Sequence, residues 1–215
     1  MSAAQVKTLR PQTGIRIAFL IGYGACAFLC VALALYSYRY LFQAGMIPPV
    51  IVDNLFLKPW LMVHVIGAAT ALLIGPVQFS SRVRTNFPML HRSIGRTYAV
   101  ACLVGGAAGF VLALGASTGP ISRLGFGGLA ISWLVTTALA WRRAMQGRFI
   151  EHRAWMIRSF ALTFAAVTLR LYLPLSMILL QVRLVDAYRA ISFLCWVPNL
   201  LIAELYLRKA KVGFR

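Results

Sequence analysis

Charged residues are scarce in this sequence, and negatively charged ones are nearly missing. Charged residues make up 12% of the 215 residues, whereas soluble domains carry about 25%. Only four are Asp or Glu, against 22 Lys or Arg. A net charge of +18 is compatible with nucleic-acid binding, because basic side chains neutralise phosphates. Here the basic residues stand in short clusters between apolar blocks, so we expect no nucleic-acid partner.

The motifs of a disulfide framework and of common hydrolases are also missing. The four cysteines (Cys26, Cys30, Cys102 and Cys195) all lie in apolar blocks, and no two form a CxxC pair. We therefore expect buried thiols that pack as small hydrophobic groups. Neither G-x-S-x-G nor H-E-x-x-H occurs, so hydrolytic chemistry has little support. Whether the chain is an enzyme stays open.

Long hydrophobic runs are what the sequence has in abundance. Hydrophobic residues make up 60% of the chain and the mean hydropathy is +0.79. A bilayer core of about 30 Å is crossed by about 20 apolar residues in a helix. The sequence therefore predicts an all-α polytopic membrane protein with six transmembrane helices. The predicted spans are 16–38, 60–80, 97–116, 122–141, 154–178 and 190–207.

The predicted organisation is one membrane domain with two short tails. The domain covers residues 16–207, between an N-terminal tail, 1–15, and a basic C-terminal tail, 208–215. The apolar stretch of the first span is too long for the core of a typical signal peptide. The triplet Ala32-Leu33-Ala34 nevertheless keeps cleavage open as an alternative.

Basic residues favour one side of the predicted membrane domain. Fifteen of the 22 Lys and Arg fall in the N-terminal tail, in the connections between spans two and three and between spans four and five, and in the C-terminal tail. Five fall in the other connections, and Arg158 and Arg170 lie within the fifth span. By the positive-inside rule both termini are cytoplasmic. Contact with the lipid bilayer explains the net charge without an acidic partner.

Small residues at helical spacing predict how the spans pack. Stripes of Gly, Ala and Ser follow the second, third and fourth spans, and such stripes allow close backbone approach in lipid. We expect spans two to five to form an inner bundle, with spans one and six outside it. The longest connection, 39–59, contains Pro48-Pro49 and an apolar run, and we expect it along the outer surface as a re-entrant or interfacial segment.

One polar stripe runs along the fifth span. Positions at alternating intervals of four and three share one face of a helix about 27 Å long. An arginine deep in hydrocarbon is costly, so we expect this face to point into the bundle. The alternative is that the arginines reach the headgroups and the hydroxyls bond their own backbone. The stripe consists of His152, Met156, Ser159, Thr163, Ala166 and Arg170.

Three histidines carry the candidate chemistry. His91 and His152 lie near the cytoplasmic ends of their spans, and His64 lies near the outer end of the second. Imidazoles from two helices are common axial ligands of a b-type haem, so His91 and His152 predict haem binding or, alternatively, a metal site. Histidine and arginine also suit proton or anion handling, including a quinone oxygen. A structural role for the histidines is equally open.

Several segments resemble a known family. They are HVIGAATALLIGPVQF, LHRSIGRTY and HRAWMIRSFALTFAAVTLRLYLP, and they are similar to the predicted bacterial membrane proteins grouped as domain of unknown function 2306. The resemblance covers about residues 60–178 and implies a helical bundle in the bacterial inner membrane. It implies little about activity. The residues at its motif positions are His64, His91, Arg92, Arg96, His152, Arg153, Trp155, Arg158 and Arg170.

Two functional hypotheses follow from these residues. The first is a redox-linked membrane component, bound to haem b or associated with quinone, whose cofactor-binding residues are His91, His152, Arg92, Arg96, Arg153 and Arg158. The second is a non-enzymatic transporter of a small polar solute, or an accessory subunit of a membrane complex. Its substrate-binding residues are His64, Thr163, Thr168, Arg170 and Tyr172.

Overall fold

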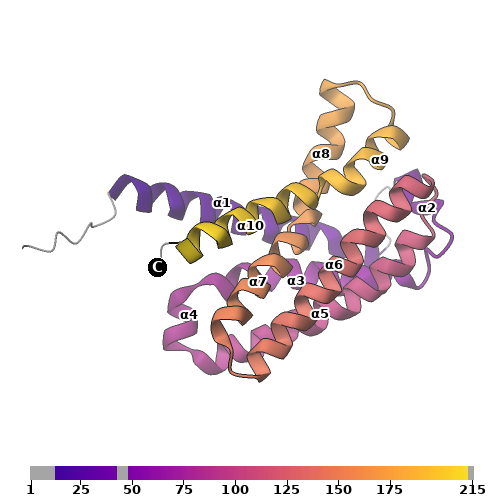
Figure 1. Cartoon of the computed structure of the whole chain (residues 1–215). Helices are drawn as coiled ribbons and strands as arrows, with labels where there is room; N and C mark the ends of the chain where they lie inside the picture. The colour runs from indigo at the N-terminus through magenta and orange to yellow at the C-terminus, as the bar shows by residue number, and fades with distance from the viewer. Residues whose placement is uncertain (1–12, 43–47, 213–215) are drawn as a thin grey trace, which may run out of the picture.

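The computed structural model describes residues 13–42 and 48–212, and its regular elements are all helical (Figure 1). Ten α-helices and two short 3₁₀ helices follow one another along the described chain. They are α1 (Thr13–Tyr38), η1 (Arg39–Phe42), α2 (Pro49–Val52), α3 (Trp60–Ile74), η2 (Pro76–Phe79), α4 (Ser81–Asn86), α5 (Pro88–Leu114), α6 (Pro120–Met145), α7 (Phe149–Thr163), α8 (Ala165–Leu179), α9 (Leu184–Leu194) and α10 (Val197–Val212).

Six helical segments within the described residues are long and apolar enough to cross a membrane, which confirms the predicted number. The third and fifth begin earlier than predicted, at Pro88 and Phe149. Their first turns are rich in basic residues and so do not appear apolar. Pro88 stands in the first helical turn, where its missing N–H has no intrahelical partner to lose. The six segments are Leu20–Phe42, Trp60–Phe79, Pro88–Leu114, Pro120–Met145, Phe149–Leu179 and Leu184–Ala210.

The bundle is built by sequential neighbours, α3 on α5, α5 on α6 and α6 on α7. Helices α3 and α5 approach most closely at two glycines. A Cβ added to Gly67 would stand 2.6 Å from the backbone nitrogen of Gly105. Neither position accepts a side chain without separating the helices, so the small-residue stripes predicted for spans two and three do meet.

The glycine stripe of α6 contacts the sixth span. A Cβ on Gly125 would stand 2.7 Å from the Cβ of Ser192 in α9, and one on Gly128 would touch the Trp196 ring at 3.4 Å. The sixth span therefore packs closely on the fourth, beside the inner bundle that spans two to five were predicted to form. Spacing shows that a helix has a close neighbour, but it does not show which one.

Helix α1 is fastened to the second span by two tyrosines. Tyr23 donates its hydroxyl proton to the Pro76 carbonyl over 2.7 Å, and the Tyr38 hydroxyl lies 2.8 Å from Thr70 Oγ1. Cys30 is fully buried between these contacts. Cys102 and Cys195 are buried too, while Cys26 is half-buried, and all four are free thiols. The prediction of buried thiols is confirmed for three of them.

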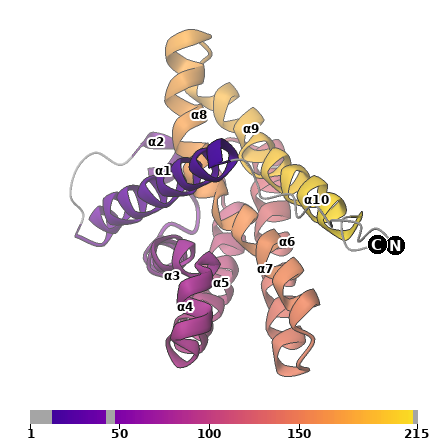
Figure 2. The same ribbon diagram turned by 90° about the vertical axis from the view of Figure 1, so that its left-hand side faces the viewer.

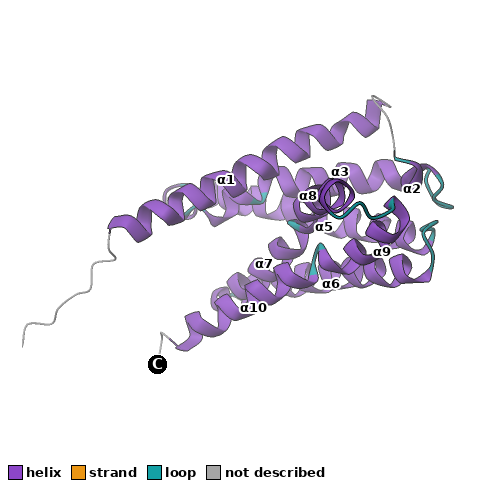
Figure 3. Ribbon diagram, turned by 90° about the horizontal axis from the view of Figure 1, so that it is seen from above, coloured by secondary structure: helices purple, strands orange, loops and turns teal. Residues whose placement is uncertain are grey.

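The fifth and sixth spans are each broken into two helices. The break in the fifth lies at Phe164, and the break in the sixth follows Leu194. The two breaks lie side by side, because Thr168 donates its hydroxyl proton to the Cys195 carbonyl and Asn199 Nδ2 donates to Thr168 Oγ1 over 3.2 Å. Beyond the breaks, α8 and α9 form a hairpin that turns away from α7 and α10 (Figures 1 and 2). Figure 3 views α8 almost end-on, while α1, α6 and α10 run across the view.

The connection between the first and second spans packs on the turn that follows α5. Asn54 Nδ2 donates to the Leu112 carbonyl over 2.8 Å, and the Leu55 amide donates to the Gly115 carbonyl over 3.1 Å. Val50 is buried. That this connection lies along the outer surface as a re-entrant or interfacial segment stays a prediction, because these contacts do not fix its depth in a bilayer. Residues 43–47 lie outside the described part of the chain.

The predicted tails are covered only in part. Arg208 and Lys209 continue helix α10, which ends at Val212. Residues 1–12, including Lys7 and Arg10, lie outside the described residues, as do residues 213–215.

Candidate ligand cavity

A cavity of about 480 Å³ lies inside the bundle. We call the end of the bundle that carries α2 the α2 end, and the opposite end, which carries α4, the α4 end. The cavity is lined from the α2 end by Pro48, Val50 and Asn54, and as deep as Trp133 and Thr163. Trp133 lies 13 residues into α6, about 20 Å along a helix with a 1.5 Å rise per residue. The cavity thus reaches the middle of the membrane segments.

Three of the lining residues are Arg or His, and none of the described lining residues is Asp or Glu. Arg39, His64 and Arg170 line the cavity, while neither Asp nor Glu is found among its lining residues in the described chain. Most of the remaining lining side chains are aliphatic or aromatic. The cavity therefore combines an apolar wall with positive charge. Two of the three, His64 and Arg170, are residues that the sequence predicted for a solute site.

Arg170 is held by neutral acceptors. Its Nη1 donates to the Ala166 carbonyl and its Nη2 donates to Ser37 Oγ, each over 3.0 Å. None of the ion pairs found among the described residues includes Arg170. A guanidinium presents five N–H donors, so these two bonds leave donors for a ligand. The charge is fixed in position without being neutralised by a carboxylate.

His64 is oriented by a bond to the neighbouring helix. Its Nδ1 lies 2.8 Å from the Gly105 carbonyl, which can only accept, so Nδ1 carries the proton. Gly109 gives the ring its space, because a Cβ there would stand 2.9 Å from Nδ1. Nε2 makes no hydrogen bond with the described residues and is the ring atom left for a ligand.

Sequence reasoning missed the aromatic residues around the cations. The Arg39 guanidinium carbon lies 4.3 Å from the ring centre of Tyr36 and 4.7 Å from that of Tyr40, and all three residues line the cavity. Tyr188 lines the cavity from α9, against the Phe126 ring at 5.1 Å. The run YSYRY at positions 36–40 was the available signal, since it places a cation between tyrosines.

The deep end of the cavity is closed by a cluster of buried polar side chains. Thr163 Oγ1 donates to the Ser159 carbonyl over 3.0 Å and accepts from Trp133 Nε1 over 2.9 Å. The Tyr98 hydroxyl lies 2.8 Å from the same Oγ1, and the Thr137 hydroxyl lies 2.7 Å from Ser159 Oγ. We call these five residues the floor cluster. It joins α5, α6 and α7 below the cavity.

The inward orientation predicted for the polar stripe of the fifth span is confirmed at its centre. Ser159 is 0% exposed and Thr163 is 4% exposed. The break at Phe164 was not predicted. Because of this break, the two ends of the stripe belong to separate helices, α7 and α8. Thr168 bonds the Phe164 and Ala165 carbonyls over 3.4 and 3.2 Å, and such back-bonding bends helices.

Two residues predicted for the same site lie elsewhere. Thr168 faces the break between α9 and α10, where its hydroxyl bonds the Cys195 carbonyl. Tyr172 packs against the cluster that contains Ala187 and Ile191. Neither lines the cavity. Each stands two residues from Arg170 within α8, about 160° around a helix of 3.6 residues per turn, so both face away from the side that Arg170 presents to the cavity.

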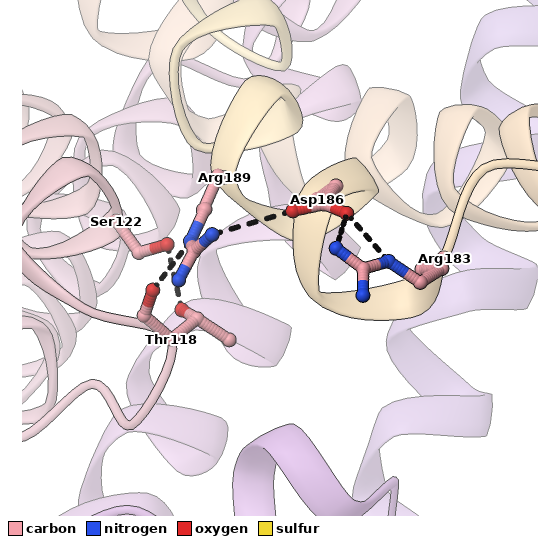
Figure 4. Close-up of polar contacts among 5 residues, drawn as sticks. All are labelled: Thr118, Ser122, Arg183, Asp186 and Arg189. Atoms are coloured by element: carbon pink, nitrogen blue, oxygen red, sulfur yellow. Dashed lines mark hydrogen bonds and ion pairs between the residues drawn. The ribbon is translucent and has the colours of Figure 1, made fainter.

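Polar contacts fasten the α8–α9 hairpin to the turn between α5 and α6 (Figure 4). Arg189 Nε donates to the Thr118 carbonyl over 2.8 Å, and its Nη1 pairs with Asp186 over 3.3 Å. Asp186 also accepts from Arg183 Nε over 2.9 Å. The hairpin supplies Leu173 and Tyr188 to the cavity wall, and the bond from Arg189 to Thr118 is the contact of these that holds this wall against the turn.

The other two histidines lie near the α4 end, His91 in α5 and His152 in α7. His152 Nδ1 donates to the Ala140 carbonyl over 2.9 Å, which leaves its Nε2 for a ligand. His91 Nδ1 is buried and has no hydrogen-bond partner among the described residues. Within the described residues, no group of three or more His, Cys, Asp or Glu could hold a metal ion.

The arginines predicted to accompany these histidines are dispersed. Arg92, Arg96 and Arg153 are exposed. Arg158 instead forms a two-pronged ion pair with Glu204 of α10, and its guanidinium carbon lies 4.6 Å from the Trp155 ring centre. Arg158 therefore ties the fifth span to the sixth, a role that the sequence pattern did not indicate.

The helices and the cavity define a class, that of helical polytopic membrane proteins with an internal cavity. The chain belongs to a family described as predicted membrane proteins with a domain of unknown function, DUF2306, whose pattern matches residues 61–207. No match to the chain was found among curated proteins or among solved structures.

Proposed function

We propose that the protein is a non-enzymatic transporter that binds a small solute in its internal cavity. The observation that carries the proposal is that the cavity joins His64, Thr163 and Arg170, which are distant in sequence. A charged residue within a membrane segment marks a substrate or ion pathway by default. Arg170 supports that interpretation, since its bonds go to neutral groups and the cavity reaches it.

The broken helices add support. Transporters commonly bind their substrates near the bilayer midplane, where discontinuous helices meet. In this chain the fifth and sixth spans are both interrupted, and Thr163, Ala165 and Ala166 beside the first interruption line the cavity. A bend at these interruptions would move the α8–α9 hairpin and so change access to the cavity.

Flux into proteoliposomes tests the proposal. The panel contains labelled glycine, glucose, methanesulfonate and octane-1-sulfonate. We expect uptake of at least one of them above that of protein-free liposomes. Arg170→Gln should slow this uptake at least about tenfold, because it removes one charge-assisted hydrogen bond to the solute. Arg183→Gln is the control, because it removes the same charge from a side chain that is 86% exposed and outside the cavity. Absence of uptake for the whole panel would reject transport.

We also propose that the α4 end faces the cytoplasm. The support is the excess of Lys and Arg in the connections at that end, which the positive-inside rule places inside. A single cysteine introduced at Gln146 of a cysteine-free variant should be labelled by a membrane-impermeant maleimide only after the membrane is opened. Labelling in intact cells would show instead that the α4 end faces the outside of the cell.

The redox hypothesis remains a second proposal with its own observation, the buried Nδ1 of His91, which has no hydrogen-bond partner among the described residues. Two imidazoles are a suitable donor set for haem b, and a bound haem would supply one-electron chemistry. Purified protein should then show a Soret band that His152→Ala abolishes. A colourless preparation from haem-replete cells would reject the hypothesis without affecting transport.

A further inference from the structure

We infer that the solute is an organic anion with an apolar body, a class narrower than the polar solute that transport alone requires. The inference rests on the proposed function for its biological meaning, but it concerns the chemistry of the cavity. That chemistry has three parts, namely the sign of the charge, the nature of the wall and the position of the polar groups.

The sign of the charge is the first part. Arg39 and Arg170 both line the cavity, and no acidic side chain of the described chain does. A cation in this cavity would meet like charge in a poorly screened interior, whereas an anion would meet guanidinium donors. Arg170 is held in place by Ala166 and Ser37 and keeps N–H donors free of protein partners. Planar guanidinium groups bind oxyanions with two parallel hydrogen bonds.

The apolar wall is the second part. Below Arg170 the cavity is lined by Leu129, Ala130, Leu162 and Leu169. A small fully hydrated anion would lose its water there and gain only the cations in return. A solute with a hydrocarbon body offsets the lost hydration of its anionic group, because its apolar part contacts the apolar wall. The volume of about 480 Å³ falls within the roughly 300–1,000 Å³ of pockets that hold drug-sized molecules.

The position of the polar groups is the third part. Arg170 lies seven residues from Thr163 in sequence, about 10 Å at a helical rise, so the cation and the cavity floor are separated along the cavity. The hydroxyl of Thr163 is already engaged by three protein groups. The anionic end therefore belongs at Arg170, and the apolar body extends toward the floor cluster.

Binding of permanently charged probes to the full chain in phosphatidylcholine nanodiscs tests the inference. Octane-1-sulfonate, octyltrimethylammonium and methanesulfonate separate the sign of the charge from the need for a body. We expect octane-1-sulfonate to bind at least about tenfold more tightly than either of the others. Along butane-, hexane- and octanesulfonate the affinity should rise about fourfold per CH₂, since each buried CH₂ contributes about 0.8 kcal/mol. These comparisons need no variant.

Arg170→Gln should weaken binding of octane-1-sulfonate by about 10- to 100-fold, the range for a charge-assisted hydrogen bond. The matched control Arg183→Gln should change the affinity for octane-1-sulfonate by no more than about twofold, because it removes a distant charge that is screened by solvent. Equal binding of the cationic probe, equal binding of methanesulfonate, or an unchanged affinity in folded Arg170→Gln would each overturn the inference.

Two sources could supply such an anion, a soluble organic acid and an anionic lipid of the bilayer. Adding phosphatidylglycerol to the nanodiscs distinguishes them. If lipid is the occupant, phosphatidylglycerol will weaken octanesulfonate binding to the wild-type chain and not to Arg170→Gln. If a soluble acid is the occupant, both proteins will respond alike. Binding of octane-1-sulfonate without flux would support the ligand class and reject the transporter. Flux of glucose or glycine alone would support the transporter and reject the ligand class.

Discussion

Replacing Thr163 by valine removes the hydroxyl on which the floor cluster depends while keeping nearly the same shape. Thr163 Oγ1 accepts from Trp133 Nε1 and lies 2.8 Å from the Tyr98 hydroxyl. Trp133 and Tyr98 are buried, at 6% and 0% exposure, so removing the oxygen leaves the Trp133 donor without a partner among the described side chains. The change therefore tests hydrogen bonding without creating a cavity.

The expected cost follows from the two interhelical bonds and from the group left unpaired. Interhelical hydrogen bonds in membranes contribute about 0.6 kcal/mol on average, so the pair contributes about 1 kcal/mol. Tyr98 keeps Ser159 as a partner at 3.2 Å, whereas no other hydrogen bond within the described part of the chain involves Trp133 Nε1. A buried unsatisfied donor costs about 1–3 kcal/mol. Thr163→Val should thus lower the free energy of unfolding by about 2–4 kcal/mol.

Equilibrium unfolding in mixed detergent micelles, followed by circular dichroism, measures this loss. Thr97→Val is the matched control, because the exposed Thr97 hydroxyl bonds only the Ser93 carbonyl of its own helix. We expect the control to stay within about 0.5 kcal/mol of wild type, as surface substitutions usually do. If Thr163→Val were as stable as Thr97→Val, the floor cluster would not hold α5, α6 and α7 together as described.

Three further outcomes are expected, the first two in the same unfolding assay and the third by trypsin cleavage. Gly67→Ala should cost about 1–3 kcal/mol by forcing α3 and α5 apart, while Gly22→Ala, with no atom within 4 Å of the added Cβ, should cost nothing measurable. Glu204→Gln should cost about 1–2 kcal/mol, between the values for exposed and buried pairs, and exchanging Glu204 and Arg158 should recover part of the loss; no recovery would exclude a direct pair. Arg189→Gln should release the α8–α9 hairpin, seen as faster trypsin cleavage at the exposed Arg183, and unchanged cleavage would contradict the role assigned to the contacts in Figure 4.

Some features of the cavity were predictable and others were not, for definite physical reasons. Arg170 and His64 stood out because a charge in an apolar run must find a partner or a cavity. Arg39, Tyr36 and Tyr40 did not, because at the end of a span a cation beside tyrosines is equally suited to the headgroup region. The position of Tyr188 depends on the fold of the hairpin, and no local pattern encodes it.

The side of the fifth span was a source of error. Thr168 and Tyr172 were grouped with Arg170 as polar residues of one span, although each stands two residues from it, about 160° around a helix of 3.6 residues per turn. Thr168 bonds the Phe164 and Ala165 carbonyls and also the Cys195 carbonyl of the sixth span. A threonine in an apolar run can bond its own helix or a neighbour, and the sequence does not distinguish the two.

The sequence by itself determined the class of the protein, the number of spans and the inward face of the fifth span, because each follows from the cost of exposing polar groups to hydrocarbon. That cost depends on composition and helical period alone. The tertiary structure decided which helices meet and where the fifth and sixth spans break. It also decided that residues from eight α-helices, α1 to α3 and α5 to α9, enclose one cavity with cations and, among the described residues, no acid. Those features depend on close contact between residues far apart in the chain, such as Gly125 with Ser192 or Arg170 with Ser37, and local patterns do not specify such partners.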